Sequence, residues 1–278
     1  MTEQWYTERY DGAALQLEIH GRLHHEQSPW QLIEVFETTT FGRLLTLDGL
    51  VMLTSRDNFI YHEMMAHPAL YSHARPQDVA IIGGGDCGVL QQVLRHDGVQ
   101  RVVQVELDER VTRVAEQYFP ELCSDNGDPR ACLSFTDGIA WMETQPADAL
   151  DVIILDTTDP VGQAARLFSE DYYRACFQAL RPGGVLVVQS ESPLFNQDLI
   201  GDIRRRMGAA GFTAVKTLHF PQYTYPSGWW SATLAGKDND LEGFRKRDAL
   251  NKGFVTHYYH AGMHAASQIL PQFMLDGL

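Results

Sequence analysis

The chain has 278 residues, of which 44% are hydrophobic and 21% are charged, a composition typical of a soluble globular protein. Its 22 Lys and Arg residues against 36 Asp and Glu residues give a formal charge of −14 at pH 7. This acidic balance argues against a nucleic-acid or membrane partner, because both need a basic face on the protein. The N-terminus does not resemble a signal peptide, and no apolar run approaches the ~18 residues that span a membrane, so we expect a cytoplasmic protein. The four cysteines form no C-x-x-C pair and are predicted to be reduced thiols.

The first 57 residues alternate polar and apolar side chains, which is typical of β-strands with one buried face. Asp48-Gly49 is a typical hairpin turn between two of these strands. We therefore expect residues 1–57 to form a small antiparallel β-domain, followed by a helix from Asn58 to about His73. The predicted strands are Ala14–Ile19, Leu32–Phe36, Leu44–Leu47 and Leu50–Leu53.

After Pro76 the pattern changes to short apolar strands that alternate with helical segments. Continuous apolar strands of this kind indicate a mostly parallel sheet with helices on both faces, which is an α/β, Rossmann-like fold. We assign residues 58–278 to this second domain. Its predicted strands are Val79–Ile82, Arg101–Glu106, Ala131–Phe135, Val152–Leu155, Gly184–Gln189, Phe212–Leu218 and Trp230–Leu234, and its predicted helices include Glu109–Tyr118, Ser169–Leu180, Leu199–Ala210 and a last one after His260.

A glycine motif of the form G-x-G-x-x-G follows the first strand of this domain, with Gly83, Gly85 and Gly88 at its three positions. Glu106 ends the next strand, 21 residues after Gly85, where an acidic side chain binds the ribose hydroxyls of a nucleotide. Asp86 lies inside the loop, and its charge would repel the pyrophosphate of a dinucleotide. An acidic loop suits instead a nucleoside with a cationic tail, such as an S-adenosylmethionine-type sulfonium.

Two further acidic segments follow strands of the same sheet. Asp137-Gly138 is suited to bind an adenine amino group, or is a plain turn. Asp156 and Asp159, three residues apart, fit a metal site, an acid/base pair, a receptor for a polycation or a helix cap. No third metal ligand accompanies them, and His62 and His67 are five residues apart where a zinc helix needs four, so we expect no metal.

At these acidic segments the chain resembles the polyamine aminopropyltransferases, and among them the spermidine synthases most closely. The resemblance covers nearly the whole chain. The matching segments are Leu47–Gly49, Phe59–Met64, Gly83–Asp86, Val105–Glu109, Asp137-Gly138, Asp156–Gly162, Leu167–Ser169, Tyr225–Gly228, Tyr258-Tyr259, His264 and Leu270-Pro271. Two positions depart from the usual family pattern, with Cys87 in place of a glycine and Gln163 in place of a proline.

The resemblance implies a small β-domain joined to a Rossmann-like domain, in a homodimer or homotetramer. It implies transfer of an aminopropyl group from decarboxylated S-adenosylmethionine, the co-substrate, to putrescine, which yields spermidine and 5′-methylthioadenosine. A methyltransferase on a similar fold and a non-catalytic polyamine-binding protein remain alternatives, and the sequence leaves open whether cadaverine or spermidine is also accepted.

The resemblance also implies a role for individual residues, with Asp156 as the catalytic aspartate. The donor is bound by Gln31, Gly83, Gly85, Asp86, Glu106, Asp137 and Gly138, and the acceptor by Tyr61, His62, Asp159, Gln189 and Tyr225.

Overall fold

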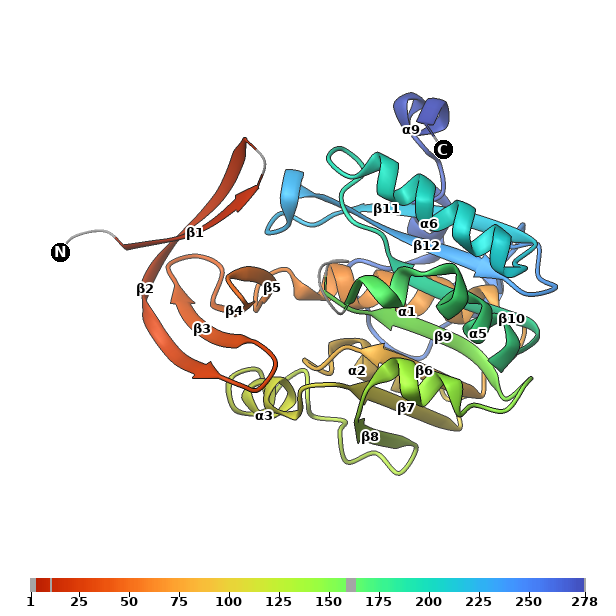
Figure 1. The fold of residues 1–278 in the computed structure, drawn as a ribbon, viewed down its shortest axis with the longest axis horizontal. Coiled ribbons are helices and arrows are strands. Elements are labelled where there is room, and N and C mark those ends of the chain that lie inside the picture. The colour runs from red at the N-terminus through yellow and green to blue at the C-terminus, as the bar shows by residue number, and fades with distance from the viewer. Residues whose placement is uncertain (1–3, 11, 159–163, 278) are drawn as a thin grey trace.

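The computed structural model describes residues 4–10, 12–158 and 164–277 (Figure 1). Its N-terminal part is a five-stranded antiparallel sheet in which neighbours in sequence are neighbours in space, in the order β1-β2-β3-β4-β5. The predicted turn at Asp48-Gly49 lies between the last two strands, and both residues have positive φ. The strands are β1 (Gln4–Tyr10), β2 (Ala13–Gln27), β3 (Leu32–Thr38), β4 (Arg43–Leu47) and β5 (Leu50–Thr54).

The second sheet has seven strands in the order β11-β12-β10-β9-β6-β7-β8. The five strands from β10 to β8 are parallel, while β12 runs antiparallel to β10 and β11 antiparallel to β12. This architecture confirms the predicted Rossmann-like α/β fold preceded by an antiparallel sheet. The strands are β6 (Asp78–Gly83), β7 (Arg101–Glu106), β8 (Ala131–Phe135), β9 (Leu150–Asp156), β10 (Leu180–Gln189), β11 (Ala214–Pro221) and β12 (Trp229–Gly236).

Helices cover both faces of this sheet, as Figure 1 shows. The long helix α1 joins the two sheets and continues through Pro68 to Ser72. The helices are α1 (Asn58–Ser72), α2 (Gly88–Leu94), α3 (Glu109–Tyr118), α4 (Gly138–Glu143), α5 (Glu170–Ala179), α6 (Gln197–Ala210), α7 (Lys246–Leu250), α8 (Ala261–Ala266) and α9 (Gln272–Gly277), with 3₁₀ turns at Ala164–Phe168 and Pro226–Gly228.

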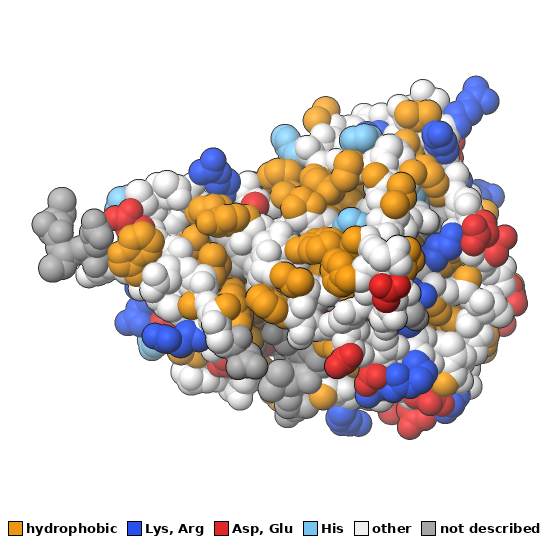
Figure 2. All heavy atoms as spheres, turned by 90° about the horizontal axis from the view of Figure 1, so that it is seen from above, with side chains coloured by type: hydrophobic (Ala, Val, Ile, Leu, Met, Phe, Trp, Pro, Cys, Tyr) orange, Lys and Arg blue, Asp and Glu red, His pale blue; other side chains and the backbone are white. Residues whose placement is uncertain are grey.

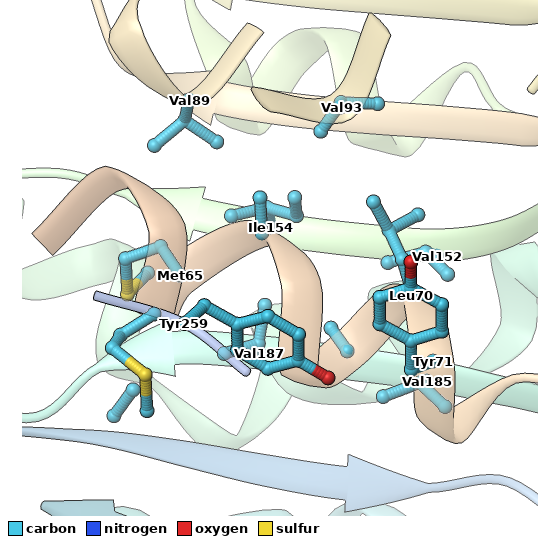
Figure 3. Close-up of a cluster of buried hydrophobic side chains, with 14 of the residues drawn as sticks. Met65, Leu70, Tyr71, Val89, Val93, Val152, Ile154, Val185, Val187 and Tyr259 are labelled. Carbon is cyan, nitrogen blue, oxygen red and sulfur yellow. The ribbon is translucent and has the colours of Figure 1, made fainter. Parts of the chain in front are cut away.

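Successive side chains of the central strand β9 enter two different cores, which explains its unbroken apolar sequence. Val152 and Ile154 pack with α1 and α2 (Figure 3), while Ile153 and Leu155 pack with α5 and α6 on the other face. The strand β9 is therefore buried along its length as far as Leu155 and ends at the half-buried Asp156. None of the helices formed by the described residues is long and apolar enough to cross a membrane.

The N-terminal sheet packs on the second domain through α3. Ile33 and Leu45 contact Val114 and Phe119 in one buried cluster, which brings β3 and β4 close to the carboxyl ends of the parallel strands. The largest departures from the prediction lie in the first two strands of the N-terminal sheet. The strand β1 has no counterpart in the prediction. The strand β2 was predicted to end at Ile19 but continues to Gln27. Its polar residues after Ile19 do not alternate with apolar ones, because the register with β3 shifts twice there.

A second link joins the start of α1 to the end of the chain. The buried Glu63 carboxylate accepts hydrogen bonds of 2.7–2.8 Å from the backbone N–H groups of His257, Tyr258 and Tyr259. The C-terminal segment is thus fixed to the helix that also carries Tyr61 and His62.

Candidate active site

The acidic residues predicted from the sequence gather where β6 and β9 lie side by side. After β6 the chain adds β7 and β8 on one side of β6, and then returns to add β9 and β10 on its other side. The strand order therefore reverses between β6 and β9. Open α/β sheets bind ligands at such points. Gly83 is paired with Asp156 in the sheet, and the Gly84 N–H donates a 2.8 Å hydrogen bond to the Asp156 carbonyl oxygen. The glycine loop and the predicted catalytic aspartate are therefore in direct contact.

The glycines of the loop leave room for carboxylates. Gly83 and Gly84 have φ of 84° and 68°, which other residues rarely adopt. A Cβ on Gly84 would lie 2.9 Å from Oδ2 of Asp156, and one on Gly85 would lie 2.9 Å from Oε2 of Glu106. These glycines are needed because two acidic side chains approach the loop backbone, in addition to any ligand.

Asp156 is held by Tyr61 from helix α1. The Tyr61 hydroxyl donates a 2.6 Å hydrogen bond to Oδ1, whereas Oδ2 is buried and has no hydrogen-bond partner among the described residues. Desolvation, helped by the charge of Asp86, raises the pKa of Asp156 to about 7, although Tyr61 and His62 pull it down. One oxygen of the carboxylate is thus oriented and the other is available to bind a cation or accept a proton.

Asp86 and His62 form a pair beside Asp156. His62 Nε2 lies 3.3 Å from Oδ1 of Asp86, and the Gly88 N–H donates to the same oxygen at 2.6 Å. Burial works against both charges, yet their attraction prevails, so the pKa of His62 is raised and that of Asp86 is lowered. The His62 ring lies so close to Gly88 that a Cβ there would be 2.1 Å from it. Within the protein, the Asp86 carboxylate is therefore paired with the His62 imidazole.

Glu106 is the third acid of the site, at the end of β7. Its Oε1 accepts a 2.8 Å hydrogen bond from the Asp108 N–H, and desolvation raises its pKa to about 7. The Asp108 carboxylate accepts hydrogen bonds from Ser28 Oγ at 2.6 Å and from Gln31 Nε2 at 3.0 Å. Gln31, predicted at the donor site, is thus near Glu106 but bound to Asp108. Ser28 and Asp108 were not predicted as site residues. Asp108 lies in the matched segment Val105–Glu109, but Ser28 belongs to no motif and is 80 residues away in sequence, so their contact could not be foreseen.

The remaining predicted residues lie around this centre. Asp137 is exposed and caps α4, since its Oδ1 accepts from the Ile139 N–H at 2.7 Å. Gly138 packs against Ile82, and a Cβ there would be 2.6 Å from that side chain. The Tyr225 ring meets the Tyr61 ring at 5.7 Å, and the Gln189 Nε2 is buried with no partner in the described part of the chain.

Asp159 and Gln163 lie outside the described residues. His67, which shares a helix with His62, faces elsewhere: its Nδ1 is 2.9 Å from Nε2 of His96 in a buried aromatic cluster. The two histidines therefore have separate environments, and no group of three or more His, Cys, Asp or Glu side chains in the described ranges is arranged to hold a metal ion.

Known proteins resemble this chain in both sequence and fold. The family model "Spermine/spermidine synthase domain" matches residues 58–243, and "Spermidine synthase tetramerisation domain" matches residues 4–55. The polyamine aminopropyltransferases of Methylococcus capsulatus and Nitrosococcus oceani are each 54% identical to this chain, over 99% and 97% of it and 97% and 95% of their own lengths. A crystal structure of spermidine synthase in complex with the transition-state analogue AdoDATO superposes with a TM-score of 0.95 at 35% identity, covering 99% of this chain and 94% of the other. By sequence, fold and family model alike, the chain belongs to the spermine/spermidine synthase family.

Proposed function

We propose that the protein transfers the aminopropyl group of decarboxylated S-adenosylmethionine to putrescine, producing spermidine and 5′-methylthioadenosine. The observation that carries the proposal is the cluster of three carboxylates, Asp86, Glu106 and Asp156, in which no Lys or Arg of the described residues forms an ion pair with any member. Such a site favours a ligand that brings its own positive charges. The analogue bound by the similar spermidine synthase structure supports the same class of reaction.

In this reaction the attacking amine must first lose a proton. An alkylamine has a pKa near 10.4, so freeing its lone pair at neutral pH costs about 5 kcal/mol. The unpartnered Oδ2 of Asp156 is placed to take this proton while Tyr61 holds Oδ1. A new N–C bond forms as the C–S bond breaks, and the bonding electrons return to sulfur, which leaves as a neutral thioether.

The site residues divide between donor and acceptor. For the donor, Glu106 binds the ribose, Asp86 the aminopropyl ammonium, and Asp137 with Gly138 the adenine, while Gly83 and Gly85 let the nucleoside approach the loop. Gln31 contributes through its hydrogen bond to Asp108, next to Glu106. The acceptor lies near His62, Tyr61, Tyr225 and Gln189, with Asp159 as the second diamine ligand.

The choice of donor tests the proposal against a methyltransferase. The decarboxylated donor brings only an ammonium to Asp86, whereas S-adenosylmethionine would add a carboxylate. At 4 Å and an effective dielectric constant near 20, one contact between like charges costs roughly 4 kcal/mol. Allowing for water and relaxation, we expect the protein to discriminate against S-adenosylmethionine at least about tenfold.

The experiment titrates both donors into the protein and follows turnover with putrescine by mass spectrometry. Equal affinity for the two donors, or methyl transfer from the intact one, would overturn the aminopropyltransferase proposal and favour the methyltransferase alternative. Binding of both substrates without turnover would instead establish a non-catalytic polyamine-binding protein. A panel of putrescine, cadaverine and spermidine in the same assay determines the acceptor, and we expect putrescine to give the highest kcat/KM.

We also propose that the protein assembles as a homodimer or homotetramer. The match of residues 4–55 to a tetramerisation domain supports this. Large apolar side chains are also exposed, including Leu194 (59%), Phe195 (50%) and Tyr223 (60%), and Figure 2 shows hydrophobic side chains gathered across one face. Light scattering should give a mass of two or four times 31.4 kDa, and a monomer at micromolar concentration would contradict assembly.

A further inference from the structure

The turn between β2 and β3 contacts the residue that caps α3 (Figure 1). Ser28 opens this turn and is buried. Its hydroxyl lies 2.6 Å from Oδ2 of Asp108 and accepts hydrogen bonds from the backbone N–H groups of Trp30 and Gln31, each at 3.0 Å. The Gln31 carbonyl oxygen is also 3.0 Å from the hydroxyl, but the carboxylate oxygen is closer. A hydroxyl has one proton and two lone pairs, so the two amides occupy its acceptor positions and the proton goes to Asp108.

Asp108 does more than cap its helix. As the N-cap of α3 it uses Oδ1, which accepts a 3.0 Å hydrogen bond from the Arg110 N–H. The cap does not need Oδ2, yet Oδ2 accepts from the Ser28 hydroxyl and from Gln31 Nε2, and the residue is only 2% exposed. The Asp108 N–H donates in turn to Oε1 of Glu106 at 2.8 Å. Asp108 therefore links the N-terminal sheet to the acid that ends β7.

We propose that Ser28 and Asp108 are positioning residues for the nucleoside donor, and that through them the N-terminal sheet orients the Glu106 carboxylate. The inference rests on the proposed function, in which Glu106 binds the ribose. Residues 4–55 match a tetramerisation domain, and Ser28 lies within them. The sheet thus has a second role, since its β2–β3 turn completes the donor site of its own chain.

The Glu106 carboxylate is placed by the protein itself. The Asp108 N–H holds Oε1, and Oε2 lies where a Cβ on Gly85 would be 2.9 Å away. A carboxylate that is already oriented loses less conformational freedom when it binds a ligand, and this strengthens binding. Loss of the Ser28 hydroxyl removes one of the hydrogen bonds that hold Asp108, so it should loosen Glu106 and weaken the nucleoside.

A second link between the same two segments supplies a matched control. Glu26, near the end of β2, accepts hydrogen bonds of 2.6 and 3.1 Å from the Arg110 guanidinium on α3. The side-chain hydrogen bonds of Glu26 in the described part of the chain go to Arg110 and His24 and not to Asp108. Glu26→Ala therefore weakens the attachment of the sheet to α3 but leaves the contact between Ser28 and Asp108 in place.

The test compares Ser28→Ala with Glu26→Ala by calorimetry and by steady-state kinetics. Ser28→Ala should raise the Kd of 5′-methylthioadenosine about tenfold, because a hydrogen bond to a carboxylate is lost. The KM of decarboxylated S-adenosylmethionine should rise by a similar factor, while kcat and the KM of putrescine stay within about twofold, as for a loss of uniform donor binding. Glu26→Ala should leave all four quantities unchanged.

A double-mutant cycle with Glu106→Gln shows whether Ser28 acts through Glu106. If Ser28 positions this carboxylate, Ser28→Ala should weaken the nucleoside much less in the Glu106→Gln protein than in the unaltered one. A general disturbance of the N-terminal sheet would instead weaken the nucleoside by the same factor in both backgrounds.

Three results would overturn the inference: an unchanged nucleoside Kd in Ser28→Ala, an equal loss of affinity in Glu26→Ala, or additive effects in the cycle. Calorimetry with 5′-methylthioadenosine requires no turnover. An unaltered protein that binds this nucleoside but forms no spermidine would contradict the proposed function, and the variants would still decide whether Ser28 positions Glu106. An unaltered protein that binds no nucleoside would overturn the inference as well.

Discussion

Tyr61 and Asp156, 95 residues apart in sequence, share a 2.6 Å hydrogen bond between the Tyr61 hydroxyl and Oδ1 of the carboxylate. The contact joins α1, the first helix after the N-terminal sheet, to the end of the central strand β9. Since the other carboxylate oxygen has no partner in the part of the chain described, the hydroxyl distinguishes the two oxygens and leaves Oδ2 as the unpaired one.

Tyr61→Phe should shift the acidic limb of the pH–rate profile upward. The tyrosine hydrogen bond lowers the pKa of Asp156, and a hydrogen bond to a charged group is worth about 1.5–3 kcal/mol, so its loss should move the limb by about 1–2 pH units. Measurement of kcat/KM between pH 6 and 9 tests this. An exposed tyrosine, replaced in Tyr223→Phe, is the control, and identical profiles for all three proteins would remove Tyr61 from the role of orienting Asp156.

Asp156→Asn should lower kcat by a factor on the order of 100 or more, because an amide cannot accept the proton of the attacking amine. The fold should persist, since the Gly84 N–H contacts the backbone of Asp156 and not its side chain. Steady-state kinetics with the circular dichroism spectrum as control decide the matter. A kcat close to that of the unaltered protein would show that proton transfer does not pass through this residue.

Glu106→Gln should weaken the binding of 5′-methylthioadenosine much more than that of putrescine. A charge-assisted hydrogen bond to the ribose is worth about 1.5–3 kcal/mol, while Gln can still accept from the Asp108 N–H. Calorimetry with each ligand separately measures both affinities. Unchanged nucleoside affinity would leave Glu106 with a structural role only.

The same variant should change the pH dependence of stability. In the fold the pKa of Glu106 is raised to about 7, so its protonated form is favoured. The stability it contributes is complete below its ordinary pKa and is lost as the pH rises through about 7. Glu106→Gln should therefore raise Tm by about 2–4 °C at pH 8 in the ligand-free protein and little at pH 5. The exposed Glu143→Gln is the matched control, and a lower Tm for Glu106→Gln at pH 8 would refute this account.

Binding of the decarboxylated donor should release more protons than binding of 5′-methylthioadenosine. The donor's ammonium competes with His62 for Asp86, and its positive charges favour the ionised form of Asp156. Calorimetry at pH 7 in two buffers of different ionisation enthalpy counts the protons. Asp86→Asn should reduce the difference between the two ligands, and equal release from both would show that no cation binds beside His62.

The positions of the acids at the strand ends could be predicted from the sequence, because parallel strands bring their carboxyl ends to one edge. Glu106 and Asp156 each follow an apolar run, and the structure places both against the glycine loop. What the sequence could not indicate were contacts between distant segments. Nothing local shows that His62 would neutralise Asp86, or that Ser28 and Gln31 would bind Asp108.

The first two strands of the N-terminal sheet, β1 and β2, were harder to predict than the central strands of the second sheet for a related reason. The buried strands β6 and β9 have unbroken apolar runs that identify them. By contrast, β1 is half exposed, and β2 loses its alternation where the register shifts after Ile19. The strength of the pattern depends on burial, so the N-terminal sheet was predicted only in part.

The hydrogen bonds from residues 257–259 to Glu63 have a consequence for how the protein is made. Glu63 leaves the ribosome almost 200 residues before its partners do, and until then its carboxylate, next to His62, has none of these three amide donors. A nascent chain that stops short of His257 thus lacks all three amide donors to this acid of α1. The C-terminal segment can therefore close onto α1 only in translation products that extend past Tyr259.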